Sequence, residues 1–154
     1  RKIIFDLRPP ALDDLGLEAV VDRYCNDFQE NTGIEVVFKK YGDKLRFNSN
    51  IEIAIFRIIQ EALINIKKHS DAKHATVKLE IKNNLVNLLI ADDGKGFNWD
   101  LSHDYSEKDR HFGLINIKER VELLNGSVKI ETSPGYGTKI FISIPLQGKE
   151  AEDE

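Results

Sequence analysis

The sequence predicts an α/β fold: a two-layer sandwich in which helices cover one face of a mixed β-sheet. Segments with helical and with strand periodicity follow one another without strict β-α-β alternation. Residues 51–66 are apolar almost all round, which is typical of a buried helix. Two alternating apolar runs, 75–81 and 86–90, are separated by Asn83-Asn84, a tight-turn signal that predicts a hairpin.

Composition narrows the range of functions. The chain has 154 residues, 41% of them hydrophobic and 31% charged, which suits one globular domain. A formal net charge of -4 argues against direct nucleic-acid binding, and any polyanion site has to be local. Cys25 is the single cysteine and lies in a helical pattern, so we expect a packed core thiol. The lack of methionine and the opening Arg-Lys-Ile-Ile-Phe lead us to expect a piece of a longer protein.

The N-terminal half alternates helices and a strand. Residues 3–7 resemble the end of a helix, which Pro9-Pro10 stops. A second helix is expected from about 14 to 31, with Gly33 as its C-cap. A strand follows over 34–40, and a third helix runs from a cap within 48–50 to about His69.

The C-terminal half contains a hairpin and a second helix–strand group. The hairpin is followed by a polar stretch, 98–111, that has no apolar period and is predicted to be a loop of low local stability. A helix is expected to open at Gly113 and to run to about 124. Strands 128–131 and 139–145, joined by 133–138, complete the sheet, and the charged tail 149–154 is expected to be disordered.

A polar stripe on the buried helix is the most informative feature. Glu61, Asn65 and His69 are spaced i, i+4 and i+8, so they share one face, and Lys68 lies beside them. Burying such groups is costly without partners. One interpretation is that Arg57 pairs with Glu61 and the stripe is merely hydrated. The other is a cavity for phosphates and a hydrated divalent cation, for which Asn65 supplies an oxygen ligand. The stripe alone leaves both open.

Glycine-rich segments supply further candidates. Asp92-x-Gly94-x-Gly96 ends a strand, and Asp92 keeps the inward parity of Val86, Leu88 and Ile90. A carboxylate accepts hydrogen bonds and so suits the amino group of adenine. Gly113 is expected to open a helix, whose free N–H groups could bind phosphates, and Gly135-Tyr136-Gly137-Thr138 is predicted to form a flexible turn. Each signal alone is equally compatible with ordinary turns and caps.

The order of these parts resembles a known family. Glu61 to His69 matches the N box, Asp92 to Phe97 the first glycine box, and His111 to Val121 with Gly135 to Thr138 the second glycine box of the Bergerat-fold (GHKL) ATPase domain. That domain is shared by gyrase, the heat-shock chaperone of ninety kilodaltons, histidine kinases and MutL. The stretch Leu7 to Leu17 resembles the junction that precedes the ATPase domain in DegS-, NarX- and DesK-like sensor histidine kinases.

The resemblance implies roles for individual residues. Asn65 would bind Mg²⁺, and Asp92 would accept from adenine with Thr138 nearby. Gly94 and Gly96 would let the adenine edge approach, while Gly113, Leu114 and Gly137 belong to the second glycine box. Lys68 and His69 would balance phosphate charge, and residues 98–111 would form the ATP lid. Glu61 is ambiguous, because its counterpart activates water in the hydrolases of the superfamily.

The resemblance also implies a larger context. Residues 1–13 would end the dimerisation helix, 14–147 would form the ATP-binding domain, and 148–154 the tail. The parent protein would be a cytoplasmic-facing homodimeric kinase, and this piece alone a monomer. It would pass the γ-phosphoryl group of ATP to an upstream histidine, then to a response regulator, which we expect to be LuxR/NarL-type. An ATP-hydrolysing member of the superfamily and a non-catalytic nucleotide-binding adaptor are the alternatives.

Overall fold

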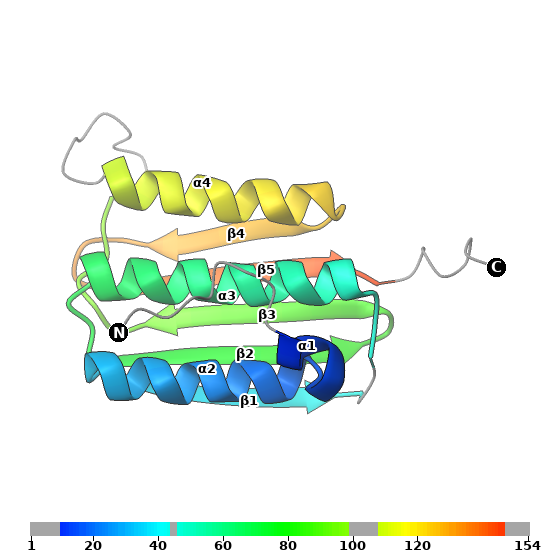
Figure 1. Ribbon diagram of the computed structural model, residues 1–154. Coiled ribbons are helices and arrows are strands. Elements are labelled where there is room, and N and C mark those ends of the chain that lie inside the picture. The colour runs from blue at the N-terminus through cyan, green and yellow to red at the C-terminus, as the bar shows by residue number, and fades with distance from the viewer. Residues whose placement is uncertain (1–9, 44–45, 99–107, 147–154) are drawn as a thin grey trace.

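The computed structural model describes residues 10–43, 46–98 and 108–146. In chain order the elements are α1 (Pro10–Leu15), α2 (Leu17–Thr32), β1 (Glu35–Gly42), α3 (Ser49–His69), β2 (His74–Lys82), β3 (Leu85–Asp92), α4 (Lys108–Leu123), β4 (Ser127–Thr132) and β5 (Thr138–Pro145). The described strands form one sheet in the order β1-β2-β3-β5-β4, in which β1 and β2 are parallel and the other pairs antiparallel. The helices α2, α3 and α4 lie side by side across one face (Figure 1). The predicted fold class is confirmed.

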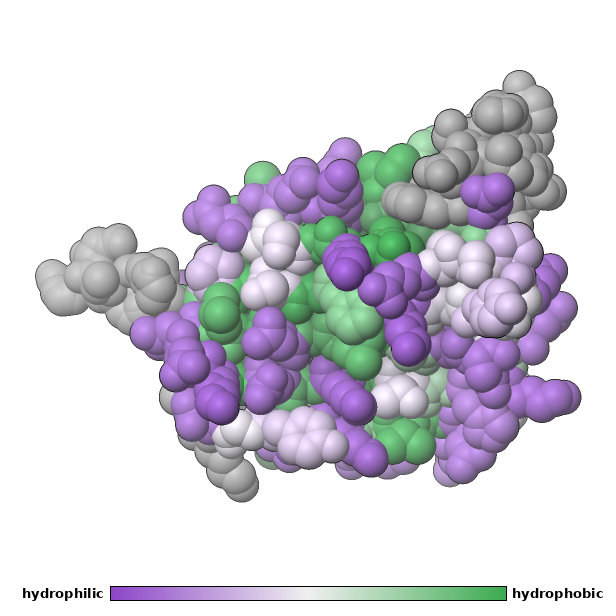
Figure 2. All heavy atoms as spheres, turned by 180° about the vertical axis from the view of Figure 1, so that it is seen from behind, coloured by the Kyte–Doolittle hydropathy of each residue, from purple (hydrophilic) through white to green (hydrophobic). Residues whose placement is uncertain are grey.

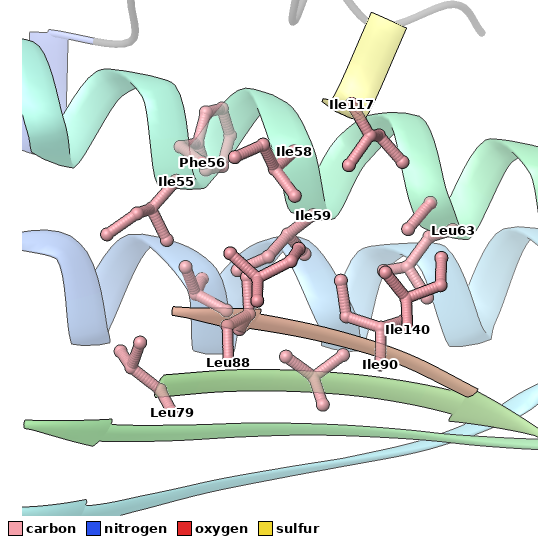
Figure 3. Close-up of a cluster of buried hydrophobic side chains, with 14 of the residues drawn as sticks. Ile55, Phe56, Ile58, Ile59, Leu63, Leu79, Leu88, Ile90, Ile117 and Ile140 are labelled. Atoms are coloured by element: carbon pink, nitrogen blue, oxygen red, sulfur yellow. The ribbon is translucent and has the colours of Figure 1, made fainter. Parts of the chain in front are cut away.

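The core lies between this helical layer and the sheet. Ile55, Ile59 and Leu63 of α3 point toward alternate residues of the central strands, including Leu88 and Ile90 (Figure 3). Burying side chains of this size stabilises a fold by about 1.5–3 kcal/mol each. The predicted apolar stripe of α2 is also buried: Leu17, Val20, Val21, Tyr24, Cys25 and Phe28. Burial raises the pKa of the Cys25 thiol to about 12, so this cysteine is an inert core group as predicted.

The opposite face of the sheet is not covered by the described helices. Hydrophilic residues surround a central group of hydrophobic ones on this face (Figure 2). Val37 of β1 and Phe141 of β5 alternate with buried neighbours along their strands and are 41% and 36% exposed. The sheet therefore has one buried and one open face, which explains the clean alternation of its strands. None of the described helices is both long enough and apolar enough to cross a membrane.

Caps and turns follow the predicted chemistry. Gly33 adopts the left-handed conformation, with φ of 80°, and its N–H donates to the Gln29 carbonyl at 2.9 Å. Asn48 caps α3 by accepting from the Asn50 N–H at 2.7 Å. Asn83 and Asn84 both have positive φ and close the β2–β3 hairpin. These local signals were therefore reliable guides to the element boundaries.

The start of the described chain differs from the prediction. Pro10 is the first residue of α1, a helix that was not predicted, and this position suits its fixed φ. The predicted helix over 14–31 is interrupted at Gly16, whose φ of 92° separates α1 from α2. Leu12 is only 1% exposed and belongs to the core, so the end of the expected junction packs against the rest of the described chain. The helix expected over 3–7 lies outside the described residues.

An ion pair fastens α1 to the beginning of α3. Glu52 is 1% exposed, and one of its carboxylate oxygens lies 3.2 Å from Arg46 Nε. The same guanidinium donates to the carbonyls of Leu12 and Asp13 at 3.3 and 3.2 Å. The buried carboxylate thus has its partner, and the last turn of α1 has donors for its carbonyls.

The polar stretch 98–111 is partly helical. Residues 99–107 lie outside the described part of the chain, but from Lys108 onward the chain is in α4. The prediction of a loop up to 111 and of a helix that opens at Gly113 is therefore wrong. The apolar period alone suggested the late start, because residues 108–112 contribute one apolar residue, the exposed Phe112.

Candidate functional site

A small cavity lies where α3, the end of β3, the beginning of α4 and β5 meet. Its volume is about 20 Å³, and it is lined by Ala62, Asn65, Ile66, Ser70, Ile90, Asp92, Phe97, Arg110, Leu114, Thr138 and Ile140. Four of the predicted site residues line it: Asn65, Asp92, Leu114 and Thr138. Six of these residues are apolar, and the five polar ones come from separate elements, a combination that is common in ligand sites.

Asp92 is the acidic group of this cavity. It ends β3 on the same face as the buried Ile90 and is paired in the sheet with Thr138 of β5. Its Oδ1 accepts from the Gly94 N–H at 2.7 Å, and within the described residues no hydrogen bond to Oδ2 is found. Burial raises the pKa of this carboxyl, whereas the Gly94 amide and the Arg110 guanidinium act against that rise. Asp92 therefore offers one acceptor oxygen to a ligand.

A hydroxyl pair sets the direction of hydrogen bonding beside Asp92. Thr132 Oγ1 donates its one proton to the Gly137 carbonyl at 2.9 Å and accepts from the Phe97 N–H at 3.2 Å. The Thr138 hydroxyl lies 2.9 Å from Thr132 Oγ1, so Thr138 must be the donor of that bond. Its own lone pairs remain as acceptors at the cavity wall. Thr132 was not predicted, because only the register of β4 against β5 brings it here.

The glycines of both glycine boxes pack against protein backbone. A Cβ on Gly94 would lie 2.3 Å from the Ser70 carbonyl oxygen, and one on Gly96 would lie 2.1 Å from that of Ser133. Gly137, with φ of 71°, leaves the same room for the backbone of Asp92. Glycine was expected here to make room for the edge of a ligand. The structure gives a different reason: only glycine allows the close backbone packing that fixes the loop around Asp92.

The polar stripe of α3 meets α4 at Gly113. Asn65 is 8% exposed, and its Nδ2 has no hydrogen-bond partner within the described ranges. A Cβ on Gly113 would lie 2.6 Å from Asn65 Nδ2 and 2.9 Å from Glu61 Oε2. Gly113 lies in the second turn of α4, so it does not present the N–H groups of a helix start to phosphates. Its role is to let α4 approach the polar stripe.

The remaining predicted residues lie at the edge of the site. His69 is half-buried and Lys68 is exposed, both in the last turn of α3, and neither lines the cavity. Arg57, expected in one interpretation to pair with Glu61, has Nη1 3.5 Å from Gln60 Oε1. The structure therefore brings Asn65, Asp92, Leu114 and Thr138 together and leaves Lys68 and His69 outside the cavity.

Arg110 and Phe97 form the part of the site that was missed. Arg110 is 3% exposed, its guanidinium carbon lies 4.4 Å from the centre of the Phe97 ring, and Nη1 is 3.4 Å from the Gly96 carbonyl oxygen. A signal existed in the sequence. Arg110 precedes Leu114, Ile117 and Val121 at helical spacing, and all of these are buried. Extending the helix back by one turn would have placed Arg110 on its inner face.

Comparison with known proteins identifies the family. The family model described as histidine kinase-, DNA gyrase B-, and HSP90-like ATPase matches residues 50–148, which includes every side chain that lines the cavity. The chain belongs to this ATPase family. The histidine-protein kinase/phosphatase DegS of Brevibacillus brevis is 46% identical over 97% of the chain, and that of Bacillus subtilis is 44% identical over 90%. The chain spans 38% and 36% of these two relatives' lengths.

Solved structures show the same fold for this ATPase-family chain. The histidine kinase domain of the Erythrobacter litoralis EL346 blue-light activated histidine kinase superposes with a TM-score of 0.67, at 20% identity, over 88% of this chain and 63% of that one. The Acinetobacter baumannii histidine kinase AdeS gives a TM-score of 0.61 at 16% identity, over 86% and 64% of the chains. These likenesses concern the fold, and the family assignment rests on the match over residues 50–148.

Proposed function

We propose that this chain is the MgATP-binding catalytic domain of a two-component sensor histidine kinase. It supplies the γ-phosphoryl group of ATP to a histidine of the dimerisation/phosphoacceptor domain of the same protein, for onward transfer to a response regulator of the LuxR/NarL type. The 46% identity with a DegS kinase/phosphatase over nearly the whole chain carries this proposal. A homodimeric parent protein with this domain in the cytoplasm belongs to the same proposal. So do residues 1–13 as the junction, 14–147 as the ATP-binding domain, and 148–154 as a charged tail.

The polarity of the cavity supports adenine as the base. Asp92 Oδ2 and Thr138 Oγ1 are both acceptors, and the amino group of adenine is a donor. Ile90 and Leu114 are among the apolar residues of the wall, and apolar side chains suit the faces of a purine base. Asn65 lies on α3 at another side of the cavity, where the phosphates of a bound nucleotide would pass.

Asn65 fits a magnesium ion. The buried Nδ2 of Asn65 donates to no group within the described chain, which is costly unless an acceptor such as a phosphate oxygen completes the site, and Oδ1 of the same amide would then serve the ion. Amide oxygen is a hard ligand, and Mg²⁺ in nucleotide sites takes few protein ligands besides water and phosphate. Bound Mg²⁺ would neutralise charge that develops on the phosphates. In this proposal Asn65 orients that ion, while Lys68 and His69 approach the phosphates from the last turn of α3.

Glu61 provides one reason to keep ATP hydrolysis as a second candidate. Its carboxylate lies beside the Gly113 position, next to Asn65, where a general base for water would be needed. In a kinase the acceptor is an imidazole, and Glu61 then orients the groups around the metal. Steady release of phosphate by the isolated chain would favour hydrolysis, and its absence would favour transfer.

Two measurements test the proposal together. Titration calorimetry of ADP with and without Mg²⁺ should show binding to the wild-type chain, and Asn65→Ala should remove most of the Mg²⁺ dependence. The exposed substitution Asn87→Ala, on the open face of the sheet, is the matched control. Label from γ-labelled ATP should then transfer to a separately produced upstream helical segment of the parent protein. Nucleotide binding without transfer to that segment, or no binding at all, contradicts the proposal.

A further inference from the structure

A buried cation closes the cavity from the α4 side. Arg110 is the one cationic group that lines it within the described residues, and only 3% of Arg110 is exposed. Burying a guanidinium is costly unless neighbouring groups compensate it. The Phe97 ring at 4.4 Å and the Gly96 carbonyl at 3.4 Å are among the groups that compensate it, and the charge of Arg110 acts on Asp92. The first glycine box therefore holds this side chain in the site.

The cavity that remains is too small for a nucleotide base. A volume of about 20 Å³ holds about one water molecule. Ile90 and Ile140 lie on the central strands of the sheet and Ala62 on α3, where backbone movement would disrupt the core. Arg110 is different, because a long flexible side chain in the first described turn of α4 can change its rotamer without moving the sheet. Entry of a base requires the cavity to widen, and Arg110 has the longest and most flexible side chain among its lining residues.

We propose that Arg110 gates the nucleotide pocket by occupying the adenine position in the empty state. This inference rests on the proposed nucleotide-binding function, and it makes the Arg110 side chain a competitor of adenine for the same position. A guanidinium is planar, so it can lie over the Phe97 ring as adenine could. It also carries N–H donors, as the amino group of adenine does, and these suit the acceptors around Asp92. The apparent affinity for adenine ligands is then reduced by the fraction of molecules in which Arg110 lies inward.

Adenosine and ADP distinguish gating from a contact with phosphate. In Arg110→Ala and Arg110→Gln we expect adenosine to bind about tenfold more tightly than in the wild type, because the competing cation–π and hydrogen-bond contacts are gone. Arg110→Gln keeps part of the stem, and circular dichroism establishes that each variant is folded. The control is Arg120→Ala, an exposed arginine of the same helix, for which unchanged affinity is expected.

The possible outcomes separate this inference from the proposed function. Unchanged or weaker adenosine binding in folded Arg110 variants overturns the gate, including the case in which only ADP weakens, which would make Arg110 a phosphate ligand. If the wild type and all variants fail to bind ADP, the proposed function fails and the gate with it. Tighter adenosine binding in both Arg110 variants, with Arg120→Ala unchanged, establishes the gate.

Discussion

At the scale of single residues, Asp92 has the clearest consequence. Its one remaining acceptor oxygen faces an apolar cavity, so Asp92→Asn presents a donor where adenine also has a donor. We expect the affinity for ADP to fall about ten- to a hundredfold, since leaving a buried polar group unmatched costs about 1–3 kcal/mol. Calorimetry measures the change, and Asp71→Asn, an exposed substitution on the α3–β2 connection, controls for loss of charge. An unchanged affinity would remove Asp92 from the adenine site.

Gly113 gives a second prediction for a single residue. Alanine is ordinarily favoured over glycine within a helix by about 1 kcal/mol. Here its Cβ would lie 2.6 Å from Asn65 Nδ2, so α3 and α4 must separate or Asn65 must turn. We expect Gly113→Ala to lower the melting temperature and to weaken MgADP binding about tenfold, whereas Asn116→Ala, on the exposed side of α4, leaves both unchanged. A more stable Gly113→Ala variant would show that the helices have room to adjust.

At the scale of elements, one carboxylate joins the beginning of β2 to the end of β3. Asp93 accepts from the N–H groups of His74 and Lys73 at 3.0 and 2.9 Å, and its Oδ2 lies 2.6 Å from His74 Nδ1. The backbone and side chain of His74 hold the pKa of Asp93 at about 2. Because this value lies below that of the unfolded chain, the stabilisation is present above about pH 4 and is lost as the pH falls toward 2.

Urea unfolding of Asp93→Asn at several pH values tests this tie. The variant should be less stable than the wild type at pH 6, and the difference should shrink between pH 4 and pH 2. Asp27→Asn, an exposed substitution on α2, serves as the control. A difference that is constant over that range would mean that the charge of Asp93 contributes nothing to stability.

Prediction from sequence succeeded where a local pattern determines an element and failed where a tertiary contact does. The strands, the buried α3 and the Asn83-Asn84 turn follow from period and turn chemistry. The beginning of α4 does not, because its first described turn is polar and Arg110 is held there by Phe97, a contact between separate segments. Thr132 could not be predicted for the same reason, since its three hydrogen bonds depend on strand register. Asn65 and Asp92 could be predicted because each belongs to a short motif that can be recognised by its residue spacing in the sequence.

At the scale of the whole molecule, we expect the isolated chain to bind ATP without phosphorylating itself. Phosphoryl transfer requires an acceptor placed in line with the γ-phosphate. His69 is half-buried on α3, and His74 lies on β2 between Asp93 and Glu35. Neither belongs to an element that can swing into line. Incubation with γ-labelled ATP, followed by acid and alkali treatment, is the measurement. Acid-labile, alkali-stable label on this chain would identify one of its own histidines as an acceptor.

The hydroxyl pair of Thr132 and Thr138 has a consequence for the choice between purines. Thr132 donates its hydroxyl proton to the Gly137 carbonyl, so Thr138 donates its own proton to Thr132. The Thr138 oxygen is therefore an acceptor toward the cavity, as is Asp92 Oδ2. Guanine carries a carbonyl oxygen where adenine carries its amino group, so it would bring a third acceptor against these two. We expect GDP to bind at least about a hundredfold more weakly than ADP, since the two groups that would face that oxygen, Asp92 Oδ2 and Thr138 Oγ1, are both acceptors. Thr132→Val would release the Thr138 proton to rotate into the cavity, so this variant should lose part of its discrimination against GDP while keeping its affinity for ADP.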